Sequence, residues 1–132
     1  MTENTNKLIE YRFEQAKETL AVAEVLLKGG HYRDAVNRAY YAMFYCSLGL
    51  LAAKNLGTSK HTGVLSLFSQ NFVKTGLISV EAGRHLREAF ELRQNSDYRE
   101  FVKISSQQAG EVIKNATEFI DESKKAFIKI KE

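Results

Sequence analysis

The stretch His31-Tyr-Arg-Asp-Ala35-Val-Asn37-Arg38-Ala-Tyr40-Tyr41-Ala-Met43-Phe44 opens a long apolar helical pattern, directly after Gly29-Gly30. Small residues recur along one edge of this pattern at helical spacing, and bulky residues widen it. The two sets are Ala35, Ala39, Ala42, Cys46, Gly49 and Ala53, and Tyr40, Phe44, Leu48 and Leu51. A helix of this kind, over about residues 31 to 55 and closed by Gly57, is expected at the centre of a bundle with neighbours on more than one side.

Four further helices are predicted, because apolar residues recur at helical spacing between clear helix boundaries. Their ranges are about 5–28, ended by Gly29-Gly30; about 60–74, ended by Thr75-Gly76; Ser79, as N-cap, to Gln94 or Asn95; and from Ser105 onward, where Ser105 and Gln108 form a capping-box pattern. We therefore expect an all-α protein, an up-and-down helical bundle of four long helices plus one short helix, in one domain over residues 1–132. Residues 95–104 are its longest irregular segment.

The composition suits long helices around a single core. The chain has 132 residues, is 44% hydrophobic and contains no proline. Its net charge of +3 is mild, and part of it comes from the lysines that close the chain, Lys124, Lys125, Lys129 and Lys131. This charge permits nucleic-acid binding but does not require it.

The lone cysteine and the polar N-terminal segment indicate a cytoplasmic protein. Cys46 has no cysteine partner and lies on an apolar helix face, which is typical of a small core residue in a reducing compartment. No apolar run approaches the roughly 20 residues that span a membrane. We expect neither export nor a membrane partner.

The segment Arg93-Gln-Asn-Ser-Asp97-Tyr98 places an arginine, a carboxylate and a phenol where the fourth helix is expected to end. Ala82, Leu86 and Phe90 precede Arg93 at helical spacing, so the guanidinium continues a buried face. One interpretation is a structural ion pair with Asp97, because buried charges are usually paired. The other is a site that recognises a phosphate or a nucleotide.

Other chemistry finds little support in the sequence. Glu81 and His85 stand one turn apart, but a metal site needs more ligands than this pair supplies. His31 is interpreted as a first-turn residue, and His61 as a solvated or capping residue. No serine has an evident His and acid partner. We expect no metal and no cofactor.

Taken together, several segments resemble the HEPN domain family, in its small single-domain prokaryotic branch. They are the stretch from His31 to Phe44, Lys60-His61-Thr-Gly63-Val, Phe68…Phe72-Val…Gly76-Leu-Ile and Arg93…Asp97-Tyr98, in this order over nearly the whole chain. The resemblance implies an all-helical bundle that forms a homodimer. Many HEPN proteins are ribonuclease toxins with an arginine followed after four to six residues by a histidine, and some pair with a nucleotidyltransferase.

Carried onto this chain, the resemblance matches the arginine with Arg93 but finds no histidine. The positions open to that histidine hold Tyr98, Arg99 and Glu100. The tyrosine that is nucleotidylated in the nucleotidyltransferase-paired branch has its place at Glu100. A phenol is a poor acid or base near neutral pH, so ribonuclease activity is not expected.

Three functional hypotheses follow. The first is a homodimeric binding module of toxin–antitoxin type for a nucleotide, an RNA phosphate or a nucleotidyltransferase partner. Its ligand-binding residues are Arg93, Asp97, Tyr98, Asn37, Arg38 and Tyr41, with Tyr40 adding aromatic surface. The second is a metal-independent ribonuclease toxin that uses Arg93 with Asp97 or Tyr98 as catalytic residues. The third is a purely structural bundle, in which these side chains only join the fourth helix to the second.

Overall fold

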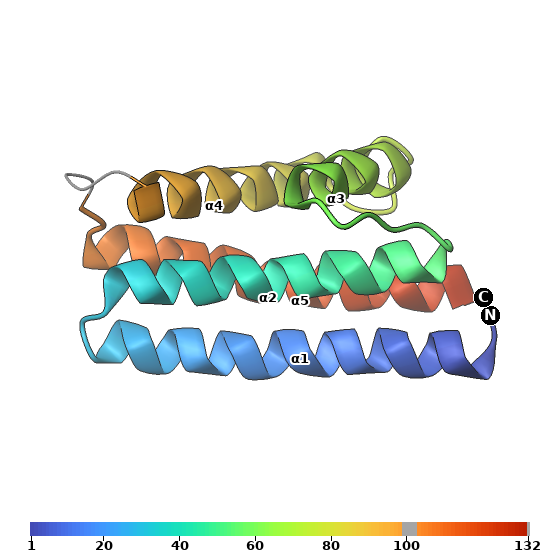
Figure 1. The fold of residues 1–132 in the computed structure, drawn as a ribbon, viewed down its shortest axis with the longest axis horizontal. Coiled ribbons are helices and arrows are strands. Elements are labelled where there is room, and N and C mark those ends of the chain that lie inside the picture. The colour runs from blue at the N-terminus through green and yellow to red at the C-terminus, as the bar shows by residue number, and fades with distance from the viewer. Residues whose placement is uncertain (99–102, 132) are drawn as a thin grey trace.

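The computed structural model describes residues 1–98 and 103–131, and helices account for most of them. In chain order the elements are α1 (Glu3–Lys28), α2 (Tyr32–Ala53), α3 (His61–Phe68), the π-helical segment η1 (Ser69–Val73), α4 (Val80–Tyr98) and α5 (Ser106–Lys131). Figure 1 shows α1 on one side, α2 and α5 in the middle, and α3 with α4 on the other side. The predicted all-α bundle is confirmed.

Helix α2 lies at the centre, as its sequence predicted. It packs on α1, α3, α4 and α5, and its small-residue edge from Ala35 to Gly49 is buried. These neighbours belong to the same chain, and they bury most of the apolar residues of α2. The high apolar content of α2 is therefore explained without a second protein copy.

Several predicted helix boundaries are confirmed by their capping bonds. Gly30 has φ +81° between α1 and α2, a conformation that glycine adopts without strain. The Ser79 hydroxyl accepts a hydrogen bond from the amide of Ala82 at 3.1 Å. Ser105 and Gln108 bond each other reciprocally, at 2.9 and 3.1 Å, as a capping box does.

Two predicted boundaries were wrong. Helix α2 ends at Ala53, where Asn55 takes up a left-handed φ of 57°, so the break comes before Gly57. Helix α4 continues to Tyr98 instead of ending at Gln94 or Asn95. Part of the predicted irregular segment 95–104 is therefore helical, and residues 99–102 lie outside the described residues.

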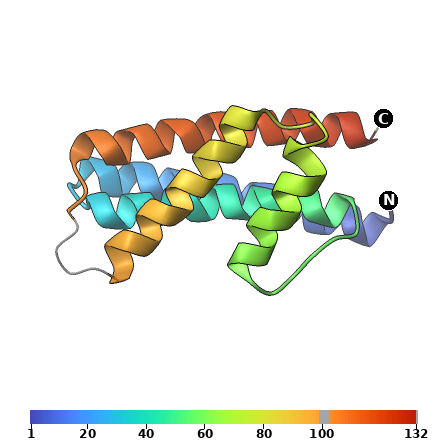
Figure 2. The same cartoon turned by 90° about the horizontal axis from the view of Figure 1, so that it is seen from above.

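The predicted third helix is two elements, because the chain changes from α- to π-helical geometry at Ser69. The amide of Lys74 donates to the carbonyl of Ser69, five residues earlier, at 2.9 Å. The ammonium of Lys54, the residue that follows α2, donates to the Asn71 carbonyl at 2.7 Å and lies 4.7 Å from the Phe72 ring centroid. This hydrogen bond from Lys54 to an η1 carbonyl is compatible with the wider π turn. Figure 2 shows α3 and α4 diverging from the connection that follows η1.

The core runs between the layers and includes the lone cysteine. Cys46 is fully buried, and burial raises the pKa of its thiol well above the ordinary value. It is the small core residue that the sequence predicted. Among the described residues no helix has both the length and the apolar content needed to cross a membrane.

Candidate anion-binding site

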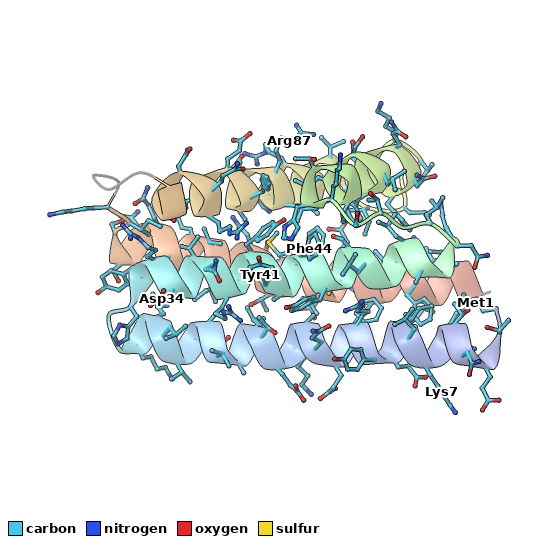
Figure 3. The ribbon with its side chains drawn as sticks, in the orientation of Figure 1. Met1, Lys7, Asp34, Tyr41, Phe44 and Arg87 are labelled. Atoms are coloured by element: carbon cyan, nitrogen blue, oxygen red, sulfur yellow. The ribbon has the colours of Figure 1, made fainter. Side chains whose placement is uncertain are left out.

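Tyr41 lies at the centre of a group of polar and aromatic side chains between α2 and α4. Its ring is half-buried, and Figure 3 shows it with Phe44 on the α2 surface that faces α3 and α4. The guanidinium of Arg93, on α4, donates a hydrogen bond to the Tyr41 hydroxyl at 3.2 Å. The Cζ atom of Arg93 lies 5.2 Å from the Tyr41 ring centroid and 5.8 Å from that of Tyr40, within the range of cation–π attraction.

Arg38 brings a second guanidinium to the same ring. It lies one helical turn before Tyr41 on α2, and its Cζ atom is 5.6 Å from the Tyr41 ring centroid. Arg38 is exposed and donates to the amide oxygen of Asn37 at 3.3 Å. Two cations from two helices thus stand within 6 Å of one phenol ring, and Arg38 is open to solvent.

An imidazole completes the group. His61, the first residue of α3, stacks on Phe44 with ring centroids 4.2 Å apart. Its Nδ1 atom lies 3.2 Å from the Tyr40 hydroxyl, and its ring packs edge-on to Tyr41 at 5.7 Å. The sequence interpretation of His61 as a solvated or capping residue was wrong, because the side chain is partly buried among three aromatic rings.

The protonation states follow from these surroundings. Burial lowers the pKa of His61 below its ordinary value of 6.5, and the nearby positive charge of Arg93 lowers it further. The imidazole is therefore predominantly neutral at pH 7. Burial also raises the pKa of Tyr40, against the opposing effect of Arg93, so Tyr40 remains a phenol. A phenol can donate to the unprotonated Nδ1 or accept from the protonated one, so Tyr40 can support either tautomer of His61.

The structure brings together four of the six ligand-binding residues named from the sequence, Arg93, Tyr41, Arg38 and Asn37. The other two, Asp97 and Tyr98, belong to the last turn of α4, but their side chains lie outside the described residues, as do Arg99 and Glu100. His61 and Tyr40 are the additional members. Nothing in local spacing identifies His61, because its contacts depend on α3 folding back over α2.

The apolar stripe predicted on α4 before Arg93 is present in the structure. Ala82 and Leu86 are buried, Phe90 packs edge-on against Tyr40 at 5.7 Å, and Arg93 follows at half-burial. The guanidinium therefore faces α2, at the edge of the buried face.

The described residues support a metal site less well than they support an anion-binding site. His85 Nε2 lies 3.8 Å from Glu81 Oε1 on α4, where the glutamate is exposed but the imidazole is largely buried. Within residues 1–98 and 103–131 no three His, Cys, Asp or Glu side chains gather where they could hold an ion.

Comparison with known proteins places this bundle in a family. Residues 9–126 match the family model of the HEPN domain. A UPF0332 protein of Thermotoga maritima is 44% identical over 115 residues, which cover 87% of each chain. Two Methanocaldococcus jannaschii proteins, each named "putative toxin", are 35% and 39% identical; the matches cover 91% and 92% of this chain and 82% and 90% of theirs.

Proposed function

The chain belongs to the HEPN domain family, and from this membership and the geometry of its site we propose that it is a toxin–antitoxin-type protein that binds a phosphate. The phosphate belongs to a nucleotide or to RNA. Arg93 and Arg38 neutralise it, and Tyr41 holds the two guanidiniums in position.

One observation carries this proposal: two arginines from different helices stand within 6 Å of the same Tyr41 ring. Guanidinium groups bind phosphate oxygens through paired N–H donors, so an arginine pair is well matched to a phosphate. A half-buried arginine also loses less rotamer freedom on binding than a fully solvated one. The hydrogen bond from Arg93 to Tyr41 supplies that ordering.

The remaining side chains of the site have supporting roles in this proposal. Asn37 accepts from Arg38 and so orients the exposed guanidinium. The Tyr41 ring offers a surface on which a base can stack, and the same role is proposed for Tyr98. Asp97 follows Arg93 by one turn of α4 and is proposed to limit the rotamers of its guanidinium.

The proposal extends to the partners. The names of the two Methanocaldococcus jannaschii relatives support a toxin–antitoxin role, and such a role implies a partner protein, which we propose to be a nucleotidyltransferase. We also propose that the protein acts as a homodimer in the cytoplasm.

The binding test uses a fluorescent RNA of about ten nucleotides, titrated with protein at two salt concentrations. Arg93→Gln and Arg38→Gln are each expected to weaken binding and to flatten its salt dependence by about one counterion. Lys7→Gln removes the same charge from an exposed position on α1 and serves as the matched control. Equal weakening by all three variants would mean that only net charge matters, and would contradict a site at Arg93.

His61 supports a second candidate function, RNA cleavage. The imidazole near Arg93 supplies the acid–base group that the segment after Arg93 lacks. In this reaction the 2′-hydroxyl attacks the adjacent phosphorus while its proton passes to Nε2 of His61. The bond from phosphorus to the 5′ oxygen breaks, and that oxygen takes the proton back from Nε2. The products are a 2′,3′-cyclic phosphate and a 5′-hydroxyl.

A cleavage assay distinguishes the two functions. His61→Asn and Arg93→Gln should each lower the rate by at least a hundredfold if His61 is the acid–base group. Binding of RNA should persist in His61→Asn but weaken in Arg93→Gln. Purified protein that binds RNA and leaves it intact would support the binding function and exclude the cleavage reaction. End-group analysis for a cyclic phosphate identifies the chemistry.

A further inference from the structure

Two adjoining surface hollows lie between α3–η1 and α4, away from the Tyr41 site. One has a volume of about 350 Å³ and is lined chiefly by apolar side chains, among them Leu65, Val73 and Val80. The other has a volume of about 330 Å³ and is lined by the hydroxyl-bearing residues Thr62, Ser66 and Ser69. Leu65 and Ser69 line both hollows, so the apolar part and the polar part form one continuous surface.

The walls of these hollows are held in place by contacts within the chain. The π turn of η1 brings Lys74 into one wall, and Lys54 anchors that turn through the Asn71 carbonyl. On the opposite wall Gly83 allows close packing: a Cβ atom there would lie 2.8 Å from Val73 Cγ2. A preformed surface of this kind loses little conformational entropy when a partner docks on it.

The shared border of the two hollows is positively charged. Lys74 and Arg87 line both of them, and no acidic side chain does so in the described part of the chain. Arg84 also lines the apolar hollow but is paired with Glu81 and Glu88 at 3.4 and 3.0 Å. Neither Lys74 nor Arg87 has such a carboxylate partner among the described residues. Figure 3 shows Arg87 on the side of α4 away from α2, where another molecule can reach it.

The accessible apolar surface of the hollows is aliphatic. Val80 is 75% exposed, and Leu65 and Val73 are partly buried. Phe68 also lines the apolar hollow, but it is 1% exposed and offers no ring face on which a nucleic-acid base could stack. An aliphatic wall beside two cations is instead complementary to a peptide that carries an aliphatic side chain and a carboxylate.

We propose that the two hollows form a docking site for an acidic peptide segment of a partner protein. An aliphatic side chain of the peptide packs between Leu65, Val73 and Val80. A neighbouring aspartate or glutamate binds between Lys74 and Arg87. Because these two cations line both hollows, the carboxylate and the aliphatic side chain must stand close together in the peptide. The site is separate from Tyr41 and does not depend on the proposed function there.

The test is a selection from a phage library of random peptides about twelve residues long, with the whole wild-type protein as bait. The matched bait carries Lys74→Glu and Arg87→Glu, two changes at exposed positions. We expect the wild type, and not the double variant, to enrich peptides in which Asp or Glu stands beside Leu, Ile or Val or within one helical turn of it. Enrichment of no such class, or equal enrichment by both baits, would overturn the proposal.

Single variants then locate the most enriched peptide by fluorescence anisotropy. Lys74→Gln and Arg87→Gln should each weaken its binding about tenfold, whereas Lys7→Gln should leave it unchanged. Val80→Ser shortens the exposed apolar wall and should weaken binding at least about threefold. Replacing the acidic residues of the peptide by their amides should have an effect as large as Lys74→Gln. Peptide binding that all of these changes leave intact would refute the site.

Competition with RNA separates this site from Tyr41 and from nucleic-acid binding. Unlabelled RNA of about ten nucleotides should not displace the peptide, because the two molecules bind different surfaces. Arg93→Gln should likewise leave peptide affinity unchanged, whatever its effect on RNA. Displacement of the peptide by RNA that persists in Arg93→Gln would show that the hollows take nucleic acid, and would overturn the proposal.

Discussion

Arg93 on α4 and Tyr41 on α2 are joined in two ways: the guanidinium donates to the phenol oxygen at 3.2 Å and lies 5.2 Å from the centroid of the same ring. These two residues are 52 positions apart in sequence, so their contact fixes how α4 sits on α2. The same contact presents a positive charge at the edge of the core. Stability and the proposed phosphate binding are therefore linked at this contact.

The variant Tyr41→Phe tests the hydrogen bond of the Tyr41 hydroxyl separately from the contribution of its aromatic ring. The variant keeps the cation–π surface and loses the hydroxyl, so we expect a loss of about 0.5–1.5 kcal/mol in the free energy of unfolding. RNA affinity should change by less than about threefold. Tyr41→Ala removes the ring as well, and should weaken RNA binding about tenfold. Urea melts and the RNA titration measure both effects. Equal RNA affinity for the two variants would show that the ring has no part in binding.

The lowered pKa of His61 predicts a pH dependence of stability. The unfolded chain takes up the proton near the ordinary value of 6.5, whereas the folded protein does so only at lower pH. Between these two values the unfolded state binds more protons, so stability falls as the pH falls. The contribution is fully present above about pH 7 and is lost as the pH falls from 6.5 through the folded-state pKa.

His61→Phe removes the titrating group and keeps a ring to stack on Phe44. Urea melts of the wild type and the variant from pH 7.5 to pH 5 should show a steeper loss for the wild type. The two proteins differ only at position 61, so the difference in slope reports His61 alone. Parallel stability profiles would contradict the lowered pKa.

Two glycines in helices, Gly110 and Gly83, should respond to alanine substitution in opposite ways. At Gly110 on α5 no atom lies within 4 Å of an added Cβ, so Gly110→Ala should stabilise the protein by about 0.5–1 kcal/mol. At Gly83 the added Cβ meets Val73 Cγ2, and the resulting overpacking should destabilise it by about 1–3 kcal/mol. Thermal melts of the two variants should shift in opposite directions. A stabilised Gly83→Ala would show that η1 is free to move away from α4.

The homodimer predicted from the sequence needs an exposed apolar surface on the chain. Since the chain itself covers α2, we look for the contact on α1, where Leu8, Tyr11, Val22 and Val25 are 44–69% exposed. An antiparallel pairing about a two-fold axis would set Leu8 against the partner's Val25 and Tyr11 against the partner's Val22. Light scattering should give twice the 15.0 kDa chain mass, and Val22→Glu with Val25→Glu should lower it. A wild-type mass of 15.0 kDa would rule out the dimer.

Local spacing was enough to predict the bundle, because each helix carries its own apolar stripe and end signals. Ser79, Ser105 and Gln108 cap helices through bonds to residues three positions away, which a sequence shows directly. The π turn at η1 could not be predicted, because it accompanies a hydrogen bond from Lys54, which follows α2 and lies 17 residues from Asn71. The end of α2 at Ala53, before the predicted residue 55, likewise depends on the left-handed backbone of Asn55.

In the candidate site, too, features set by local spacing were predicted and features set by tertiary packing were not. The position of Arg93 toward α2 followed from Ala82, Leu86 and Phe90, all within three turns of α4. The role of His61 did not follow, because it lies 21 residues from its hydrogen-bond partner Tyr40, on a helix whose direction is set by tertiary packing. His61 was therefore interpreted from the sequence as a solvated or capping residue, whereas the fold brings its imidazole from α3 to Tyr40 and Tyr41.

The short turn between α1 and α2 affects how the chain folds during synthesis. These two helices follow each other directly in the chain and pack along their length, so they can pair before the later helices are made. The surface of α2 that receives α4 and α5 is made early, but its partners are translated afterwards, at roughly 5–20 residues per second. Until then the nascent hairpin exposes the apolar face of α2 that α4 and α5 later cover, and a chaperone can protect this face from aggregation.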